Sequence, residues 1–494
     1  MISRSAWSNY IFMALICLVV STGHAQDLVW QHHHGGVYNE NGYAGLETGE
    51  GGYLILGNTY SYGAGGFDLY LLKISAAGDT LWTRTIGGID TDYGYDVVSS
   101  GNDGYVLVGS TRSFGSGKKD VYLVCTDSLG SIVWSKTYGG SEDDEGRSVR
   151  RTGDHGYIIC GTSNSWGAGY SDIYLVKTDS LGNLVWSETF GGTGGETGYA
   201  VRQTIDGGYI AVGATGSFGT GYSSVYAVRA NASGDSLWAT TYGGSGADLA
   251  YSVEIAGDQG YLIIGATSSS GSGYTDGYLI KTDANGVVLW EKTYGGTGDD
   301  RLYHLCRALD GTYLLTGTTD SYGAGKIDIY LVRTDPAGDT IWTETVGGSN
   351  SDYGRMVFQD QLNDYLVIGE SYSYSAGGTD VFIVKVGGET TPVLDDDPGN
   401  LPSGYKLVQN YPNPFNSTTS IEYALPRHAD ISLTIFNLLG QVVREYRLDR
   451  QRAGVHIIQW NGTDQDGYEV ASGIYFYRLS AGEYTETRKM LIIK

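Results

Sequence analysis

The stretch from Trp82 to Val133 reads WTRTIGGIDTDYGYDVVSSGNDGYVLVGSTRSFGSGKKDVYLVCTDSLGSIV, and it is one copy of a unit that recurs along most of the chain. Tryptophans mark the period, each 52 residues after the one before, at Trp30, Trp82, Trp134, Trp186, Trp238, Trp290 and Trp342. No insertion or deletion interrupts these intervals. A fixed period of this length predicts a β-propeller or a solenoid.

Each unit divides into four short apolar segments separated by Gly, Asp and Ser. In residues 89–140 the segments are Tyr95–Ser99, Tyr105–Thr111, Val121–Asp127 and Ile132–Tyr138. Segments of this length that are rich in Val, Ile, Tyr and Thr are typical of β-strands joined by turns. Four strands in each unit is the composition of a propeller blade.

The two ends of the repeat region predict how the ring closes. The seventh unit stops after its third strand, near Val386, whereas residues 28–34 (LVWQHHH) form a fourth strand with no unit before it. If this N-terminal strand completes the last unit, seven blades close without an unpaired edge. The sequence therefore predicts an all-β, seven-bladed β-propeller of 52-residue, four-stranded blades over residues 26–387.

The segment before the repeats has the features of a secretory signal peptide. Arg4 supplies positive charge, residues 11–20 (IFMALICLVV) form an apolar core, and residues 23–25 (GHA) form a cleavage site. We therefore expect residues 1–25 to be removed. No later segment approaches the roughly 20 apolar residues of a membrane span, so we expect no transmembrane segment in the mature chain.

The net charge limits the classes of partner that we expect, and the cysteine content bears on disulfide bonding. The formal net charge of −24 repels nucleic acid and anionic membranes, so neither is expected as a partner. No cofactor is expected, although such an acidic surface could attract Ca²⁺. The remaining cysteines, Cys125, Cys160 and Cys306, stand at different positions of different units, which is not the pattern of a disulfide framework.

The repeat ends before the last hundred or so residues. Residues 388–404 are rich in Pro, Gly and Asp, and this composition is typical of a linker. From residue 405 to 494 the pattern changes to alternating strands such as 420–425 (SIEYAL), 431–436 (ISLTIF) and 474–479 (IYFYRL). Such alternation, with turns every eight to twelve residues, predicts a small immunoglobulin-like β-sandwich.

Four motifs in this C-terminal region resemble the type A sorting domain of the bacterial type IX secretion system. They are YPNPFN (411–416), NLLGQVV (437–443), GIYFYRL (473–479) and KMLIIK (489–494). The residues that carry the resemblance are Tyr411, Pro412, Asn413, Pro414, Phe415, Asn416, Gly440, Gly473, Tyr475 and Lys489. The resemblance implies a Gram-negative bacterium of the Bacteroidetes type, the type IX machinery as a partner, and a location outside the cell or on its outer surface. The domain is also similar to flagellar hook-capping immunoglobulin-like domains, whose fold that family shares.

The 52-residue unit is similar to secreted bacterial β-propeller repeats, and this resemblance brings no catalytic residues. The sequence contains no nucleophile elbow, HExxH or P-loop motif, and its inter-strand loops are short, whereas active sites usually occupy longer loops. We therefore expect a non-catalytic module that binds a glycan or a protein, for adhesion or display. A hydrolase or lyase acting on polysaccharides is the alternative, and a purely structural surface component is a third.

Acidic residues recur in the loop between the fourth strand of one unit and the first strand of the next. Asp92, Asp144, Asp248, Asp300 and Asp352 are candidate Ca²⁺ ligands, because they would form a crown of carboxylates on one face of the ring. The competing interpretation is that each acid accepts hydrogen bonds from its own loop, including from serines such as Ser113 and Ser165. A residue that is identical in every blade satisfies a need of every blade, which favours the second interpretation.

Positions that differ between blades are better candidates for ligand binding. The first strands line the channel of a propeller, and there Arg147, Arg301, His304 and Arg355 concentrate basic groups beside Tyr303 in an acidic chain. This composition favours an acidic polysaccharide or a carboxylate at the channel mouth, unless the cations neutralise neighbouring acids. Trp166, the largest in a series of loop aromatics, is a further candidate, since such rings either stack on a ligand or fill gaps between blades.

Overall fold

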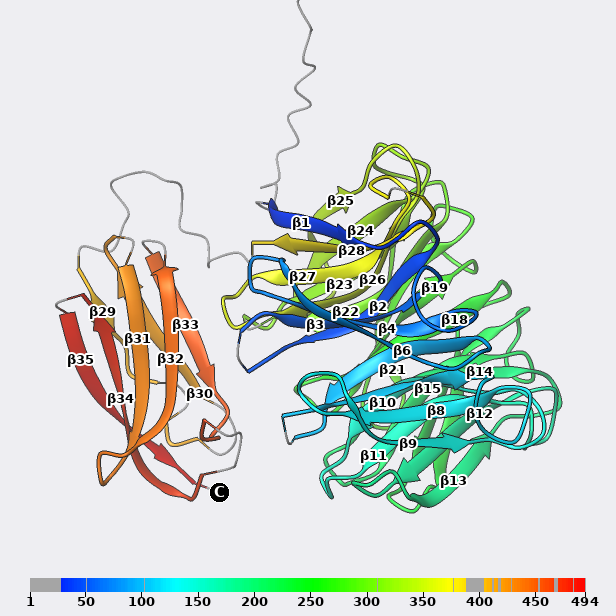
Figure 1. Ribbon diagram of the computed structural model, residues 1–494, viewed down its shortest axis with the longest axis horizontal. Coiled ribbons are helices and arrows are strands. Elements are labelled where there is room, and N and C mark those ends of the chain that lie inside the picture. Colours follow the sequence, from blue (N-terminus) through cyan, green and yellow to red (C-terminus); the bar gives the residue numbers. More distant parts are fainter. Residues whose placement is uncertain are drawn as a thin grey trace, which may run out of the picture.

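The computed structural model describes residues 28–493 except 50, 102, 309, 376, 388–403, 411–412, 416–418, 428, 452–453, 466–469 and 483. The predicted signal peptide, nearly all of the predicted linker, and Tyr411, Pro412 and Asn416 lie outside the described residues. The described part consists of strands, turns and loops (Figure 1), and it contains no helix long and apolar enough to cross a membrane.

Residues 28–387 form the predicted seven-bladed β-propeller, with seven antiparallel sheets of four strands each. We call the strands of a blade a to d from the channel outward. The blades are β2 (Glu40–Glu47), β3 (Tyr53–Thr59), β4 (Asp68–Ile74) and β5 (Thr80–Ile86); β6 (Asp92–Ser99), β7 (Tyr105–Thr111), β8 (Asp120–Thr126) and β9 (Ile132–Tyr138); β10 (Asp144–Arg151), β11 (Tyr157–Ser163), β12 (Asp172–Thr178) and β13 (Leu184–Phe190); β14 (Glu196–Gln203), β15 (Tyr209–Thr215), β16 (Ser224–Ala230) and β17 (Ser236–Tyr242); β18 (Asp248–Ile255), β19 (Tyr261–Thr267), β20 (Asp276–Thr282) and β21 (Val288–Tyr294); β22 (Asp300–Arg307), β23 (Tyr313–Thr319), β24 (Asp328–Thr334) and β25 (Thr340–Val346); and β26 (Asp352–Gln359), β27 (Tyr365–Ser371), β28 (Asp380–Val386) and β1 (Leu28–His34).

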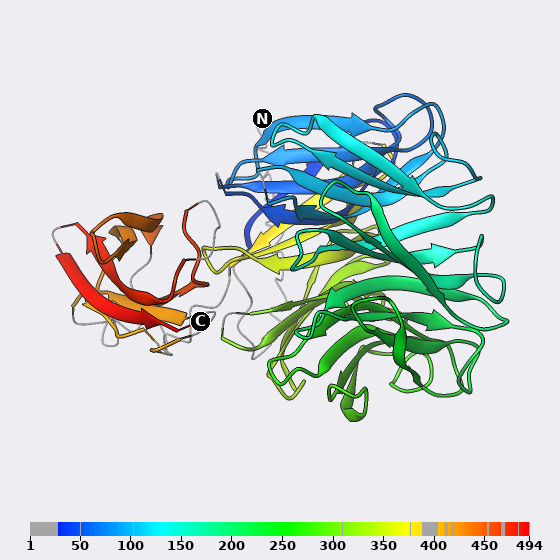
Figure 2. The same ribbon diagram turned by 90° about the horizontal axis from the view of Figure 1, so that it is seen from below.

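The N-terminal strand closes the ring as the sequence predicts. β1 pairs antiparallel with β28, for example His33 with Phe382, and so supplies strand d of the last blade. Neighbouring a strands contact each other around the whole ring, including β26 and β2 at the closure. Figure 2 shows the propeller from its side, with successive blades following one another from blue at the top to green at the bottom.

The strand boundaries match the prediction closely, with one extension. Strand a of the second blade begins at Asp92, earlier than the predicted Tyr95, and the second and fourth strands match the predicted bounds. The extension exists because residues 92–94 already pair with residues 109–111 of strand b. In addition, the amide of Asp92 donates to the carbonyl of Phe67 in the preceding blade at 2.6 Å.

The connections between strands divide between two faces of the ring. The d–a loops (such as 191–195) and the b–c loops (such as 164–171) lie on one face, which we call the loop face, and the a–b and c–d turns lie on the other, the turn face. β28 is a c strand, so it runs away from the loop face and ends at the turn face. In Figure 1, β1 starts and β28 ends at the left edge of the ring.

Every a strand contains a β-bulge at the same place. In the first blade Gly42 pairs with Gly57 and Ala44 with Leu56, so Tyr43 has no partner on strand b. A glycine is needed on strand b opposite the bulge, because a Cβ on Gly109 would lie 1.7 Å from the carbonyl oxygen of Tyr93. The bulge turns the extra side chain of each blade toward the channel.

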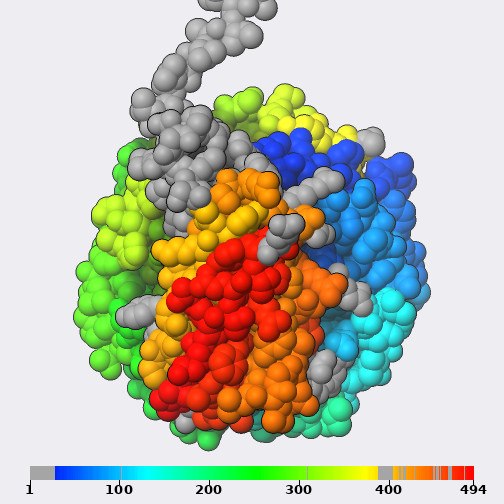
Figure 3. Space-filling model, turned by 90° about the vertical axis from the view of Figure 1, so that its left-hand side faces the viewer, coloured from blue at the N-terminus to red at the C-terminus, as the bar shows by residue number. Residues whose placement is uncertain are grey.

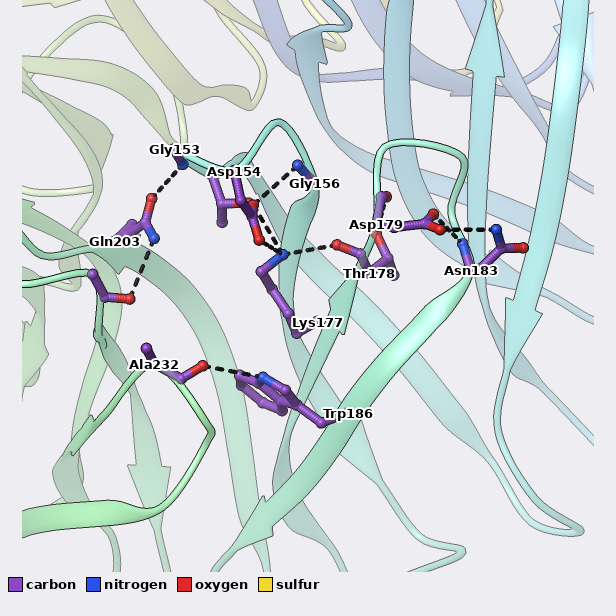
Figure 4. A network of polar contacts seen from close by, with 12 residues as sticks. Gly153, Asp154, Gly156, Lys177, Thr178, Asp179, Asn183, Trp186, Gln203 and Ala232 are labelled. Atoms are coloured by element: carbon purple, nitrogen blue, oxygen red, sulfur yellow. Dashed lines mark hydrogen bonds and ion pairs between the residues drawn. The ribbon is translucent and has the colours of Figure 1, made fainter.

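The periodic tryptophans join each blade to the next. The Trp186 indole donates to the carbonyl of Ala232, in the c–d turn of the following blade, at 3.2 Å (Figure 4). The ring of Trp134 lies against Gly182 of the next c–d turn, where an added Cβ would be 2.6 Å from the indole. The pair of Trp and turn Gly therefore recurs because it builds the contact between blades.

A buried cation on strand c holds the a–b turn of most blades. The Lys177 ammonium donates to Asp154 at 2.8 Å and to the carbonyl of Thr178 at 2.8 Å (Figure 4). Burial alone would raise the pKa of Asp154, but its hydrogen bonds with Lys177 and Thr152 lower that pKa to about 2. The equivalent pairs are Arg229–Asp206, Lys281–Asp258 and Arg333–Asp310, and in the last blade Lys385 pairs instead with Asp360, two residues earlier in the turn.

Residues 404–493 form the predicted β-sandwich. One sheet has the order β29 (Lys406–Leu407), β30 (Thr419–Leu425) and β33 (Gly454–Trp460); the other has the order β32 (Val442–Gln451), β31 (Ala429–Asn437), β34 (Gly473–Ala481) and β35 (Tyr484–Ile492). Their inner faces enclose one core that includes Trp460, Tyr423, Tyr477 and Leu433. Figure 3 shows the last two strands (red) running across the surface of this domain, beside the orange strands of the same sheet.

We expect Gly182→Ala to destabilise the propeller more than Gly207→Ala. Both glycines have positive φ, +74° and +82°, so each alanine costs about 1–2 kcal/mol of backbone strain. Only the Cβ at residue 182 meets the Trp134 ring, whereas nothing lies within 4 Å of one at residue 207, and overpacking adds about 1–3 kcal/mol. Denaturant unfolding of the two variants measures the difference. Equal midpoints would contradict the role of the Trp–Gly contact.

Candidate functional site

Seven bulged side chains line a cavity in the central channel. They are Tyr43, Tyr95, Arg147, Tyr199, Tyr251, Tyr303 and Arg355, one from each a strand, and the cavity encloses about 200 Å³. The residues that follow them, such as His304 and Ser148, line the same cavity. In a regular strand, adjacent side chains point to opposite faces. The bulge is the reason that both Tyr303 and His304 reach the channel.

The seven side chains form a closed circuit of ring contacts. Aromatic pairs join Tyr43 to Tyr95, Tyr199 to Tyr251 and Tyr251 to Tyr303, with centroids 5.4, 5.1 and 4.9 Å apart. The two guanidinium groups complete the circuit. Arg147 lies 4.2 Å from the Tyr95 centroid and 5.9 Å from that of Tyr199, and Arg355 lies 5.0 Å from that of Tyr303 and 5.8 Å from that of Tyr43. Such contacts hold the ring together without a ligand.

Both arginines of this ring are paired with carboxylates. Arg147 donates from Nε to Glu145, which also accepts from the Lys119 ammonium at 2.7 Å. Burial alone would raise the pKa of Glu145, but Arg147 and Lys119 hold it below its ordinary value. Arg355 donates from Nε to Glu370 at 3.2 Å. The cations of the channel are therefore neutralised within the protein.

A second charged cluster lies further along the a strands, on the side of the channel away from the loop face. Arg150 pairs with Asp96, and Arg202 pairs with Glu254. His304 stands between them, and its Nδ1 is one of the buried atoms of the described residues that have no hydrogen-bond partner. Burial and the positive charge of Arg202 lower the pKa of His304 to about 4. This imidazole is therefore neutral at pH 7.

The structure brings together four of the six predicted ligand-binding residues. Arg147, Tyr303, His304 and Arg355 line one cavity. Arg301 lies on the same strand as His304, and its side chain is hydrogen-bonded to Tyr251, a member of the ring. Trp166 is not part of this cavity, because it belongs to a b–c loop and packs on Tyr174 with a centroid separation of 5.5 Å.

Sequence reasoning missed the acids that pair with the channel arginines. Glu145, Asp96, Glu254 and Glu370 each occupy a position that holds a different residue in the other blades. The sequence did contain a signal for these pairs. Two blades have an arginine where the other blades have tyrosine, at Arg147 and Arg355, and the same two blades also have an unusual acid, at Glu145 and Glu370.

The recurring acids of the a strands serve their own loops. Asp92 accepts hydrogen bonds from the Ser113 hydroxyl at 2.7 Å, the Gly88 amide at 2.8 Å and the Thr111 hydroxyl. Asp144, Asp248, Asp300 and Asp352 repeat the bonds from the serine hydroxyl and the glycine amide. Among the described residues, no group of three or more His, Cys, Asp or Glu side chains is placed to hold a metal ion.

The aromatic series of the b–c loops fills space within the blades. Trp166, Phe114, Phe218, Tyr62, Tyr322 and Tyr374 each contact the ring of the c-strand aromatic in the same blade, at centroid distances of 5.2 to 5.9 Å. Their outer edges stay partly exposed. The loop face therefore combines packed aromatic side chains with solvent-accessible ring surface.

The described residues of the predicted sorting motifs join both ends of the sandwich. The amide of Phe415 donates to the carbonyl of Leu491 at 3.0 Å, and the Asn413 side chain accepts from the Leu491 amide at 2.9 Å. Lys489 contributes its carbonyl, which accepts from the Gln409 side chain at 2.8 Å. The motif around residue 413 and the C-terminal motif are thus parts of one seam.

The remaining motif residues shape the turns and core of the sandwich. Pro414 follows Asn413 through a cis peptide bond, and Gly440 has a positive φ of +75° in the turn after β31. Gly473 begins β34. Tyr475 is buried against Trp460, and its hydroxyl donates to the carbonyl of Ala471 at 2.9 Å.

Comparisons with known proteins agree with this architecture. Residues 413–484 match the family model of the FlgD Ig-like domain, which confirms the predicted likeness to hook-capping immunoglobulin-like domains. No curated protein matches the sequence.

Several solved structures resemble the chain distantly. PorZ, an essential bacterial surface component of the type-IX secretion system of Porphyromonas gingivalis, is 12% identical over 90% of this chain and 69% of its own, with a TM-score of 0.35. Sqt1 of Chaetomium thermophilum is 11% identical over 74% of this chain and 100% of its own, with a TM-score of 0.45. A protein of unknown function from Dyadobacter fermentans is 13% identical over 59% of this chain and 93% of its own, with a TM-score of 0.40. Such distant resemblances transfer no functional residue to this chain.

We expect the pair of Arg355 and Glu370 to be strongly coupled. Glu370→Gln leaves the guanidinium without its counter-charge in a largely buried site and costs about 3 kcal/mol. Adding Arg355→Gln should recover part of that loss. The double variant should therefore lose less free energy of unfolding than the two single variants lose in total. The exposed pair Lys118–Glu142 is the control, with a coupling below about 1 kcal/mol. Additive effects at Arg355 and Glu370 would contradict the pairing.

We expect His304 to make stability depend on pH. Its pKa falls from 6.5 to about 4 on folding, so below pH 6.5 the unfolded state binds a proton that the folded state does not. Stability is therefore complete above pH 6.5 and falls as the pH drops toward 4, by up to about 3 kcal/mol. The His304→Gln variant should not show this loss of stability at low pH. Unfolding curves of the wild type and the variant between pH 4 and 7.5 measure the difference. A constant difference between them would contradict the assignment.

Proposed function

We propose that this chain is a secreted, non-catalytic binding propeller that a Gram-negative bacterium exports through type IX secretion and presents outside the cell. The observation that carries the proposal is that the repeated polar residues bind groups of their own loops. The acids common to the blades accept hydrogen bonds from their own loops, as Asp92 does from Ser113 and Gly88. A catalytic centre needs differently tuned groups in one place, whereas these residues hold loops in position for contact with a partner.

The channel supports the same proposal. Its arginines are neutralised by carboxylates, and its ring of seven side chains makes continuous internal contacts. An acidic polysaccharide or carboxylate in the channel would meet guanidinium groups whose charge Glu145 and Glu370 already offset. For this reason we place the binding surface on the exposed loops rather than in the cavity.

The sandwich is the proposed sorting domain. Residues 413–484 match a family with the immunoglobulin-like fold, and the motif residues around Phe415 and Lys489 form a seam between the first and last segments of the domain. Motifs that lie far apart in sequence thus contribute to one surface, which secretion machinery would recognise only in the folded domain.

Export is tested by expressing the full chain and a variant that ends at Gly387 in a type IX-competent bacterium and in an isogenic strain without the system. We expect the full chain outside the cell only in the competent strain, and the shortened chain in the periplasm of both. Export of the shortened chain, or of the full chain without the system, would refute the sorting role.

Binding and catalysis are separated by a second experiment. The purified chain is incubated with a panel of neutral and acidic polysaccharides and of extracellular proteins, with binding and the release of reducing ends both measured. The proposal predicts binding with no increase in reducing ends over a heat-denatured control. Turnover would support a hydrolase or lyase instead, and a protein without any partner would be a structural surface component.

A further inference from the structure

Three tyrosines stand almost fully exposed at equivalent positions of three consecutive blades. Tyr170, Tyr222 and Tyr274 are each separated by one 52-residue period, and their exposed fractions are 83%, 91% and 81%. Among the described residues, their side chains take part in no hydrogen bond and no ring contact. The remaining blades carry Gly66, Lys118, Lys326 and Gly378 at this position. These tyrosines are therefore not required by the blade itself.

The backbone beneath the three tyrosines is fixed. The amides of Tyr170, Tyr222 and Tyr274 donate to the carbonyls of Gly194, Gly246 and Gly298 in the following blade, at 2.9, 3.0 and 3.1 Å. The next residue of each loop forms a parallel bridge with the same d–a loop, such as Ser171 with Gly195. The three phenol rings thus stand on a rigid base, which reduces the entropy lost when a ligand binds.

Five loops that carry the three tyrosines or lie between them contain no charged residue. The loops 164–171, 191–195, 216–223, 243–247 and 268–275 contain Gly, Ser, Thr, Ala, Asn and aromatic residues, but no Lys, Arg, His, Asp or Glu. Charged residues border this sector on both sides, with the Lys118–Glu142 ion pair on one side and the exposed Asp299 and Lys326 on the other. In a chain with a net charge of −24, these five loops form a neutral, hydroxyl-rich surface.

From this arrangement we infer that the five loops form a binding platform for a neutral polysaccharide, with Tyr170, Tyr222 and Tyr274 stacking on sugar rings of one polymer chain. We call these loops the tyrosine sector. The inference rests on the proposed binding function and names its ligand class. The apolar face of a pyranose ring packs on a phenol, while its hydroxyl groups reach the serine and threonine hydroxyls and the loop carbonyls. Trp166 and Phe218 add half-exposed ring surface within the same sector.

The repetition of the platform favours a polymer over other ligands. A polysaccharide presents the same ring at regular intervals, and the blades present the same phenol at regular intervals, whereas the surface of a globular protein does not repeat. A single small molecule needs a concave pocket, but the cavity in the channel is not lined by these residues. An acidic polysaccharide or a nucleic acid needs cations, which the sector lacks.

The test compares three variants of the secreted chain. Tyr170→Ala, Tyr222→Ala and Tyr274→Ala are combined to remove the three rings, and the corresponding triple Phe variant keeps the rings without their hydroxyls. Tyr372→Ala, in a b–c loop of the closing blade, is the matched control. Because the three side chains are so exposed, neither triple variant should measurably shift the denaturant midpoint of unfolding. Affinity electrophoresis then measures binding to laminarin, xylan, mannan and amylose, and to alginate and polygalacturonate.

We expect binding to at least one neutral polysaccharide, a loss of at least about tenfold in affinity in the triple Ala variant, and changes within about twofold in the Phe and Tyr372→Ala variants. Undiminished binding by the triple Ala variant would overturn the inference. So would a wild-type chain that binds only the acidic polysaccharides, only proteins, or nothing at all. Binding to those other partners would leave the proposed binding function standing, whereas cleavage of any polysaccharide would refute that function and not the location of the site.

Discussion

The pairing of β1 with β28 is the interaction on which the rest of the propeller depends. It joins residues 28–34 to residues 381–386, the two ends of the ring, and it gives the closing blade its fourth strand. Because a closed ring must contain a whole number of blades, each blade has to span the same share of the circle. This constraint explains the constant 52-residue period, since an insertion within the packed strands of one blade would disturb the contacts of its neighbours.

The residues that recur in the blades build contacts between or within blades. Trp186 reaches the c–d turn of the following blade, Lys177 fixes an a–b turn, and Asp92 gathers the donors of two loops. The residues that depart from the pattern fall into two groups. In the channel they form compensating pairs such as Arg355 and Glu370. On the loop face they form the tyrosine sector, whose three exposed tyrosine side chains make no hydrogen bond and no ring contact among the described residues.

Much of this architecture can be predicted from the sequence, because tryptophans and glycines at a fixed period reveal the blades, and the orphan strand at 28–34 reveals the closure. The channel is harder to predict. Tyr303 and His304 both line it only because of a bulge, and the sequence does not show which acid meets which arginine. The exposure of Tyr170 is also hidden, since the packed Tyr62 and the exposed Tyr170 both occur in Gly-rich b–c loops. Only the fold shows that one position packs on strand c and the other projects into solvent.

The position of β28 within its sheet has a mechanical consequence. In the other blades the chain leaves through the outermost strand, but here β1 occupies that edge, so the exit strand is flanked by β27 on one side and β1 on the other. A pull transmitted from the C-terminal domain would act along the axis of β28 and load two hydrogen-bonded ladders together in shear. Peeling an edge strand breaks such bonds one after another, whereas shear strains them at the same time. The chain therefore leaves the ring through a strand that resists tension along its own axis.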